Sequence, residues 1–248
     1  MMKFILKFFL LLPGFLYSAS ALFSAPTSPS TANGITEAFL DVKLSTSVPG
    51  IITVKKFKEG DAVREGDVIF ELDKQLEELE VIRRKAVMDN RKADFEATSV
   101  LFKTSKSVSK EEVEKKELEF KVARTEHDIA VEQLRRRQLI SPLSGWITEM
   151  HIEVGEACQP YQSVVRVVDV HRCYFISHLE AKQAVALKLD QNVKMEIDTG
   201  AAPANVDGKI VYLAPVADPA SGLIRIKVLF ENPDGKVRPG LAGKIFLN

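Results

Sequence analysis

Four histidines and two cysteines are the side chains of this sequence that could bind a metal ion: His127, His151, His171, His178, Cys158 and Cys173. No two of them have the spacing of a helical or knuckle zinc site, although His171 and Cys173 are close in the chain. The cysteines could instead form a disulfide in an oxidising compartment, or Cys158 could be a small buried residue. The sequence has no Ser/His/Asp arrangement and no phosphate-binding glycine loop. We therefore expect no catalysis and no bound metal or cofactor.

Composition limits the kinds of partner. The 248 residues are 46 % hydrophobic and 27 % charged, which is typical of a globular chain of one or two domains. The formal net charge is +0, so electrostatics alone favours neither nucleic acid nor an anionic surface as the main partner.

The N-terminus has the pattern of an export signal. The basic stretch MMKFILK precedes the apolar run Phe8–Tyr17, and Ala19-Ser20-Ala21 supplies the small residues that signal peptidase requires. We predict a signal peptide at 1–21, with retention as an uncleaved inner-membrane anchor as the alternative. Residues 22–34 are rich in Pro, Ser and Thr and are predicted to be a flexible leader.

Residues 48–73 and residues 140–170 form a weakly similar internal repeat. A single offset of 95 positions superposes Gly50 on Gly145 and Gly60 on Gly155. Short two-residue alternations separated by turn clusters predict a small meander of strands in each copy, and two such copies would cover each other as a sandwich. The predicted structural turn residues are Gly50, Gly60, Gly66, Gly145, Gly155 and, nearer the C-terminus, Gly240.

Between the copies, residues 74–139 are rich in good helix formers and contain neither Gly nor Pro. Ser109 and Glu112 form a capping-box pattern, so a second helix is expected to start there and to pair antiparallel with the first, with a tip near 103–109. The predicted seam of the first helix is Leu72, Leu76, Leu79, Ala86, Ala93, Ala97 and Val100; that of the second is Val113, Phe120, Ala123, His127, Ala130 and Leu134.

Residues 171–248 are predicted to form a small β-barrel. Its β-rich runs are separated by turn signals, and Asn232–Gly235 (NPDG) reads as a hairpin turn. The helix-prone segment Leu179–Lys188 could plug one end, and the strand at 35–47 could join the barrel before the chain enters the first repeat.

These segments resemble a known family. VPGIITVKKFKEGDAVREGDVIFELD and ISPLSGWITEMHIEVGEACQPYQSVVRVVD are similar to the two lipoyl half-motifs of periplasmic adaptor subunits of tripartite efflux pumps. These subunits are also called membrane fusion proteins, of the HlyD and resistance-nodulation-division (RND) types. Asp218–Ser221, Ile224–Phe230 and Val237–Leu241 resemble the family's barrel signature. The resemblance implies a mainly β fold: a split lipoyl-like β-sandwich interrupted by an antiparallel coiled coil, followed by a small β-barrel.

The same resemblance implies a non-catalytic adaptor in the periplasm, associated with the inner membrane. The hairpin tip would meet an outer-membrane channel protein, the adaptor would form a homo-oligomeric ring, and the barrel side would face an inner-membrane transporter, with the RND type favoured. The family's membrane-proximal domain is expected to be absent. The alternatives are a stand-alone periplasmic scaffold or metal-binding protein, or a lipoyl or biotinyl carrier domain.

Two departures from family patterns concern individual residues. In the family's tip motif, Ser109 fits the Ser, but Phe102 stands at the Leu and Thr98 at the Arg. The candidate docking residues at the tip are Phe102, Lys103, Ser105, Lys106, Val108 and Ser109. Lys74 follows Asp73 where lipoyl or biotinyl carriers hold their cofactor, but the predicted hairpin replaces the exposed turn that a modifying ligase would recognise.

Overall fold

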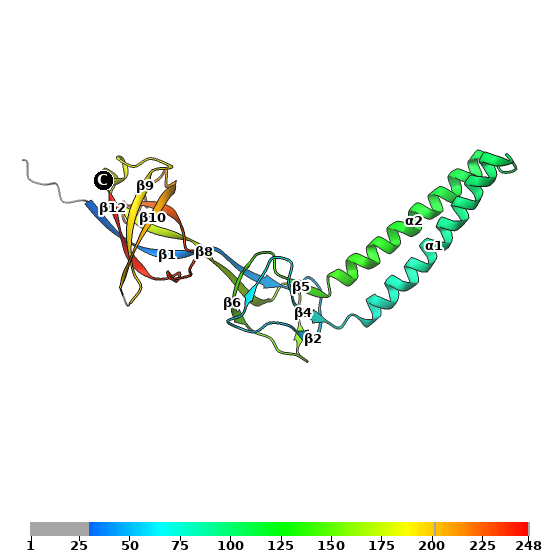
Figure 1. Ribbon diagram of the computed structural model, residues 1–248, viewed down its shortest axis with the longest axis horizontal. Helices are drawn as coiled ribbons and strands as arrows, with labels where there is room; N and C mark the ends of the chain where they lie inside the picture. Colours follow the sequence, from blue (N-terminus) through cyan, green and yellow to red (C-terminus); the bar gives the residue numbers. More distant parts are fainter. Residues whose placement is uncertain (1–29, 201, 248) are drawn as a thin grey trace, which may run out of the picture.

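The computed structural model describes residues 30–200 and 202–247. The predicted signal peptide at 1–21 and most of the predicted leader lie outside these residues. The described chain is elongated, with a β-barrel at one end, a smaller β-sandwich in the middle and a pair of long helices at the other end (Figure 1).

The elements follow one another in the order β1 (Ser30–Ser45), β2 (Gly50–Lys55), β3 (Ala62–Val63), β4 (Val68–Leu72), α1 (Gln75–Thr104), α2 (Lys110–Arg135), β5 (Gln138–Ile140), β6 (Gly145–Met150), β7 (Ala157–Cys158), β8 (Ser163–Leu179), α3 (Ala181–Ala184), β9 (Asn192–Asp198), β10 (Pro203–Leu213), β11 (Ile224–Glu231) and β12 (Ala242–Leu247).

Two long strands, β1 and β8, run through both β parts of the molecule. They pair antiparallel from Gly34↔Ser177 to Ser45↔Ser163, and this pairing closes the barrel order β1-β12-β9-β10-β11-β8. β1 begins at Ser30, so residues 30–34, which the sequence assigned to a flexible leader, belong to the barrel. Their backbone pairs with β12, and this pairing offsets the conformational entropy that a polar stretch loses when it becomes ordered.

The β-sandwich is built from the two repeats, each of which completes the other. The amide of Gly60 donates to the Ile147 carbonyl at 2.8 Å, and the amide of Gly155 donates to the Ile52 carbonyl at 2.9 Å. Both glycines have φ near +90°, which an L-residue adopts only with strain. Gly50 and Gly145 were predicted to be turn residues, but they begin β2 and β6.

Each β part has its own apolar core. The sandwich core includes Ile52, Phe70 and Val167, and the barrel core includes Phe175, Met195 and Ile226. Leu179, Ala184 and Leu187 are buried at the end of the barrel that carries α3, so the helix-prone segment does cover one end, although α3 itself spans only Ala181–Ala184.

Asn232–Gly235 forms a turn but not a hairpin, contrary to the sequence prediction. Gly235 donates to the Asn232 carbonyl at 3.1 Å and has φ +62°, yet β11 and β12 on either side of this connection are not neighbours in the sheet. The Asn232 side chain is buried and donates to the carbonyls of Val170 (2.7 Å) and Val237 (2.8 Å). The amide therefore ties this connection to β8.

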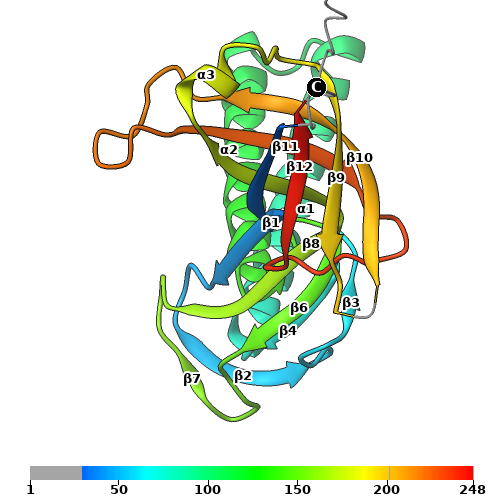
Figure 2. The same cartoon turned by 90° about the vertical axis from the view of Figure 1, so that its left-hand side faces the viewer.

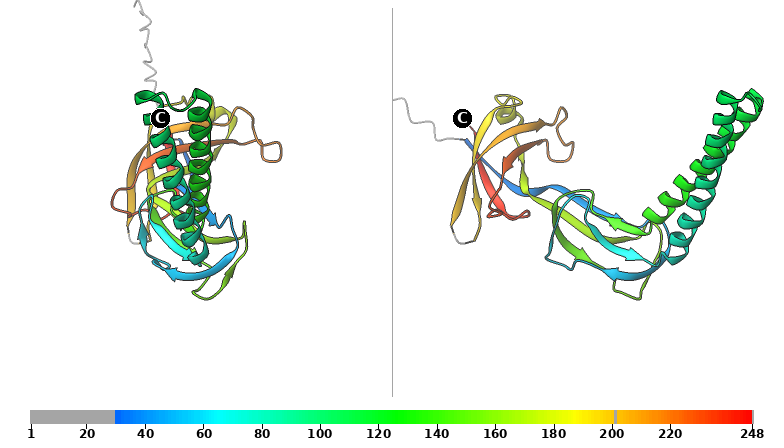
Figure 3. Two further views of the ribbon diagram at one scale, coloured as in Figure 1. Left: turned by 90° about the vertical axis from the view of Figure 1, so that its right-hand side faces the viewer. Right: turned by 45° about the vertical axis from the view of Figure 1, so that its right-hand side comes forward.

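α1 and α2 lie side by side and run in opposite directions (Figure 3). α1 has 30 residues and α2 has 26, so at about 1.5 Å per residue the pair extends roughly 40 Å from its base. The chain enters α1 from β4 and leaves α2 into β5, and β4 and β5 are paired. Both ends of the helical pair are thus fixed to one edge of the sandwich.

Candidate partner-docking sites

The face of α1 that packs against α2 is not the predicted one. Its half-buried apolar residues recur every seven positions, at Val81, Met88, Phe95 and Phe102. Leu72 of the predicted seam is buried in β4, and the rest of that seam lies on the opposite face of α1, where Leu79 is 63 % exposed. In α2 the predicted stripe does face inward, with Ala123 and Ala130 buried.

The error has a physical cause, because the true α1 seam contains two charged residues. Arg84 and Arg91 alternate with its apolar residues and form ion pairs across to α2, with Glu126 and with Glu119 respectively (3.4 Å for Arg91 Nη1 to Glu119). A purely apolar pattern therefore selects the wrong stripe. Phe95 stacks on Phe120 with ring centroids 6.3 Å apart.

Ion pairs fix the base of α1 to the sandwich. The carboxylate of Glu71 on β4 is largely buried and accepts from Lys56 Nζ at 2.8 Å and from Lys74 Nζ at 2.6 Å. The hydrogen bonds from Lys56 and Lys74 hold the pKa of Glu71 below its ordinary value of 4.5. Lys74 is therefore bound at the start of α1 and is not presented on an exposed turn.

The base of α2 is fixed by Arg137. Its guanidinium donates to the Pro49 carbonyl at 2.9 Å and pairs with Glu77 on the first turn of α1. One side chain thus connects the end of α2, the start of α1 and the segment before β2.

The tip residues divide into two groups. Phe102 and Val108 are half-buried, whereas Lys103, Ser105, Lys106 and Ser109 are exposed. Ser109 is the N-cap of α2 and accepts from the Glu112 amide at 3.2 Å, which is half of the predicted capping box. The exposed surface of the tip is therefore cationic and hydroxyl-rich. Leu101, which is 47 % exposed, also belongs to it and was missed because it lies outside the motif.

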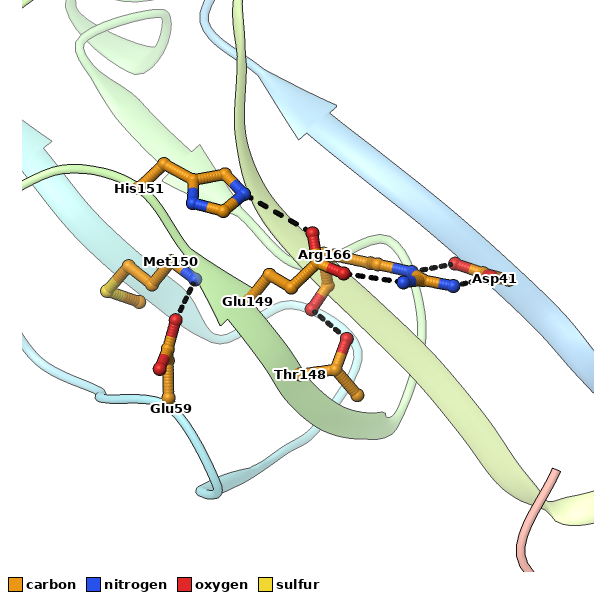
Figure 4. Close-up of polar contacts among 7 residues, drawn as sticks. All are labelled: Asp41, Glu59, Thr148, Glu149, Met150, His151 and Arg166. Atoms are coloured by element: carbon orange, nitrogen blue, oxygen red, sulfur yellow. Dashed lines mark hydrogen bonds and ion pairs between the residues drawn. The ribbon is translucent and has the colours of Figure 1, made fainter. Parts of the chain in front are cut away.

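A polar cluster lies on the sandwich part of the long strands (Figure 4). Arg166 on β8 donates two hydrogen bonds to Asp41 on β1 (2.8 and 2.6 Å) and one to Glu149 on β6 (2.6 Å). Glu149 also contacts His151 at 3.2 Å. The hydrogen bonds of Arg166 lower the pKa of Asp41 and of Glu149. These contacts bind three strands together beside the place where the chain passes into the barrel.

The candidate metal and disulfide residues are not brought together. Cys158 lies in the sandwich core and Cys173 in the barrel core, and both are free thiols. Burial raises the pKa of Cys173 to about 11, so its thiol stays protonated at neutral pH. Among the described residues, no three His, Cys, Asp or Glu side chains are grouped to hold a metal ion.

Family comparisons agree with this architecture. Residues 41–170 match the family described as RND MFP, barrel-sandwich hybrid domain, and residues 178–248 match the CusB-like, beta-barrel domain. The chain belongs to the RND-type membrane fusion proteins.

Several relatives are named as periplasmic linkers of efflux pumps. The solvent efflux pump periplasmic linker SrpA of Pseudomonas putida is 24 % identical over 223 residues, covering 84 % of this chain and 58 % of that protein. The uncharacterized protein YdhJ of Escherichia coli is 28 % identical over 165 residues, covering 62 % of this chain and 58 % of YdhJ. This chain thus matches a little over half the length of these relatives.

Solved structures show the same fold. A MacA-MexA chimeric protein that contains the Pseudomonas aeruginosa MexA α-hairpin domain matches 88 % of this chain and 82 % of its own, with a TM-score of 0.74 and 19 % identity. A putative efflux transporter from Bacteroides eggerthii gives a TM-score of 0.70 at 20 % identity, with 87 % and 67 % coverage. Within residues 30–200 and 202–247, neither long helix has an apolar stretch that could span a bilayer.

Proposed function

We propose that this protein is a non-catalytic periplasmic adaptor that links an inner-membrane transporter, of the RND type, to an outer-membrane channel protein in an efflux or export complex. The observation that carries the proposal is the α1–α2 pair, which extends roughly 40 Å from the sandwich and is held at its base by Glu71 and Arg137. A projection fixed in this way can set the distance between two partners. The periplasmic linkers among the relatives support the same role.

The tip of the α1–α2 pair would be the contact with the channel. Lys103, Ser105, Lys106 and Ser109 present cations and hydroxyl groups to solvent, whereas Phe102 and Val108 are half-buried. Such a surface favours an acidic or carbonyl-rich partner. Because Thr98 stands where the family's tip motif has Arg, Lys103 and Lys106 supply the positive charge of the tip.

The outward stripe of α1 supports assembly into a homo-oligomeric ring. The stripe is apolar, repeats every seven residues and has no partner within the described chain. Its members are Leu76, Leu79, Ala86, Ala93, Ala97 and Val100. A stripe of this period fits another helix of the same period. A neighbouring copy would supply that helix. Sedimentation of an Ala93→Asp variant, with Glu96→Asp as the control, would show weaker self-association for Ala93→Asp only.

The bridging role is tested by photo-cross-linking in cells, with a photoreactive residue at Lys106 on the tip, at Lys236 on the barrel, or at Lys85 midway along α1. All three side chains are exposed. We expect an outer-membrane channel at Lys106 and an inner-membrane transporter at Lys236, and neither at Lys85. Capture of neither protein in cells that contain abundant adaptor would contradict the proposal and favour a stand-alone scaffold.

A further inference from the structure

The end of the barrel that carries α3 has exposed apolar side chains on two loops. Val185 and Leu189, which follow α3, are 84 % and 59 % exposed, and Val216, between β10 and β11, is 75 % exposed. Figure 2 shows α3, the C-terminus and the β10–β11 connection together in the upper part of the barrel. Single exposed apolar residues are common, but three at one end of a barrel form a surface.

The loop that carries Val185 and Leu189 is anchored to the barrel core. Ala184 and Leu187, which alternate with them, are buried in the barrel core. Backbone hydrogen bonds join Leu187 to Ala184 (3.1 Å) and Asp190 to Ile210 (2.9 Å). The core therefore holds this loop with its two apolar side chains pointing outward.

Among the described residues at this end, two lysines are in no ion pair. Asp190 pairs with Lys209 at 2.9 Å, Glu180 caps α3, and Asp218 accepts from Ser221. Lys182 and Lys188 are exposed, and in the described part of the chain no carboxylate lies within 4 Å of either ammonium group. Two lysines beside two outward apolar residues match an interface of anionic headgroups over acyl chains.

The position of Ser30, where the described chain begins, supports the same occupant. Gln183 in α3 donates to the Ser30 hydroxyl at 2.8 Å, so the chain enters the barrel at this end. If the N-terminal segment is retained as the uncleaved anchor, its apolar run Phe8–Tyr17 lies in a membrane. At about 3.3 Å per residue, the 30 − 17 = 13 steps from Tyr17 to Ser30 span at most roughly 43 Å.

We propose that the α3 end of the barrel lies on the surface of an anionic phospholipid membrane, with Val185 and Leu189 entering the headgroup region and Lys182 and Lys188 binding phosphate groups. This goes beyond the adaptor role, because it gives the barrel a lipid contact in addition to any protein contact. One copy offers a small apolar area and binds weakly, but the copies of a ring would act together.

The test places an environment-sensitive fluorophore on the full chain at Val185→Cys, with Val154→Cys as the control. Val154 is an exposed valine on the sandwich (55 %). The native cysteines are at most 1 % exposed and so remain unlabelled. Vesicles contain phosphatidylethanolamine with phosphatidylglycerol, or phosphatidylcholine alone. We expect a blue shift of the fluorophore at 185, but not at 154, on the anionic vesicles.

Charge variants identify the source of the binding. Lys182→Gln with Lys188→Gln should raise the lipid concentration needed for half of the shift by roughly thirtyfold, since each lysine near an anionic surface contributes about 1 kcal/mol. Lys103→Gln with Lys106→Gln at the helical tip removes the same charge and should leave the signal at 185 unchanged. Circular dichroism confirms that each variant is folded.

Three results would overturn the proposal. The fluorophore at 185 could stay in water while the protein is held on vesicles by its first 29 residues. It could shift only in native membranes that contain a transporter, which would identify a protein contact instead. Equal shifts at 154 and 185 would show non-specific adsorption.

Discussion

Gly66 and Tyr161 occupy equivalent positions in the two repeats, since 66 + 95 = 161, and both have positive φ (+90° and +63°). The Gly66 amide donates to the Ser141 carbonyl and the Tyr161 amide to the Thr46 carbonyl, each at 2.9 Å. Ser141 and Thr46 are themselves 95 residues apart. The repeat has therefore kept a backbone conformation and a hydrogen bond where the side chain has changed.

Tyr161→Gly should raise the free energy of unfolding by about 0.5–1 kcal/mol. Left-handed backbone costs an L-residue roughly 1–2 kcal/mol, and the greater freedom of glycine in the unfolded chain offsets part of the gain. Little packing is lost, because Tyr161 is 83 % exposed. Urea unfolding measures the change. Gly66→Ala is the matched control and should lower stability; a destabilised Tyr161→Gly would show that the ring makes contacts that matter.

Phe95→Asp should destabilise the α1–α2 pair by about 2–4 kcal/mol, because it places a carboxylate in the half-buried seam beside Phe120. Leu79→Asp, in the same helix but facing outward, should change the stability of the isolated protomer by less than about 0.5 kcal/mol. Thermal melting followed at 222 nm compares the two. Equal losses would mean that α1 presents a different face to α2.

Ser109→Ala should lower stability by about 1 kcal/mol, since the first turn of α2 loses its hydroxyl acceptor. Ser109→Asp should keep the cap, and Ser107→Ala should have little effect because Ser107 caps no helix. Amide hydrogen exchange at Glu112 provides the local measurement. If the Glu112 amide is equally protected from exchange in Ser109→Ala, the Ser109 hydroxyl does not cap α2.

Glu71 should make folding sensitive to acid. Its folded pKa lies below 4.5, so the stabilisation is complete at pH values above 4.5 and is lost as the pH falls through the folded pKa. Glu71→Gln should cost about 1–2 kcal/mol at pH 7 and should reduce the slope of stability against pH below 4.5. Urea titrations at pH 7 and pH 3.5 measure both effects. An unaltered slope in Glu71→Gln would assign the acid sensitivity to other carboxylates.

The repeats, the barrel strands and the start of α2 could be predicted because local signals specify them. Turn glycines, two-residue alternation and the Ser109 cap each act within a few residues. The α1 seam could not be predicted from the sequence. Arg84 and Arg91 become acceptable seam residues only when Glu126 and Glu119 lie opposite them. The start of β1 was missed for a similar reason, since a polar segment becomes a strand only through pairing with β12.

The site residues also divide into those that local sequence signals identify and those that depend on distant contacts. Ser109 was identified from its spacing to Glu112, whereas Leu101 and the ion pairs of Glu71 and Arg137 depend on contacts between distant segments. The NPDG turn was recognised but placed between the wrong strands, because sequence cannot show that Asn232 bonds to Val170 on β8.

Because α1 leaves from β4 and α2 returns to the adjacent β5, the helical pair can change length without disturbing the sandwich. Its seam repeats every seven residues, so adding one heptad to each helix would move the tip outward by about 10 Å and preserve every contact at the base. The distance from the base of the helical pair to its tip can thus change in steps of one heptad. A change in the distance between two partners requires only insertions in one uninterrupted stretch of sequence.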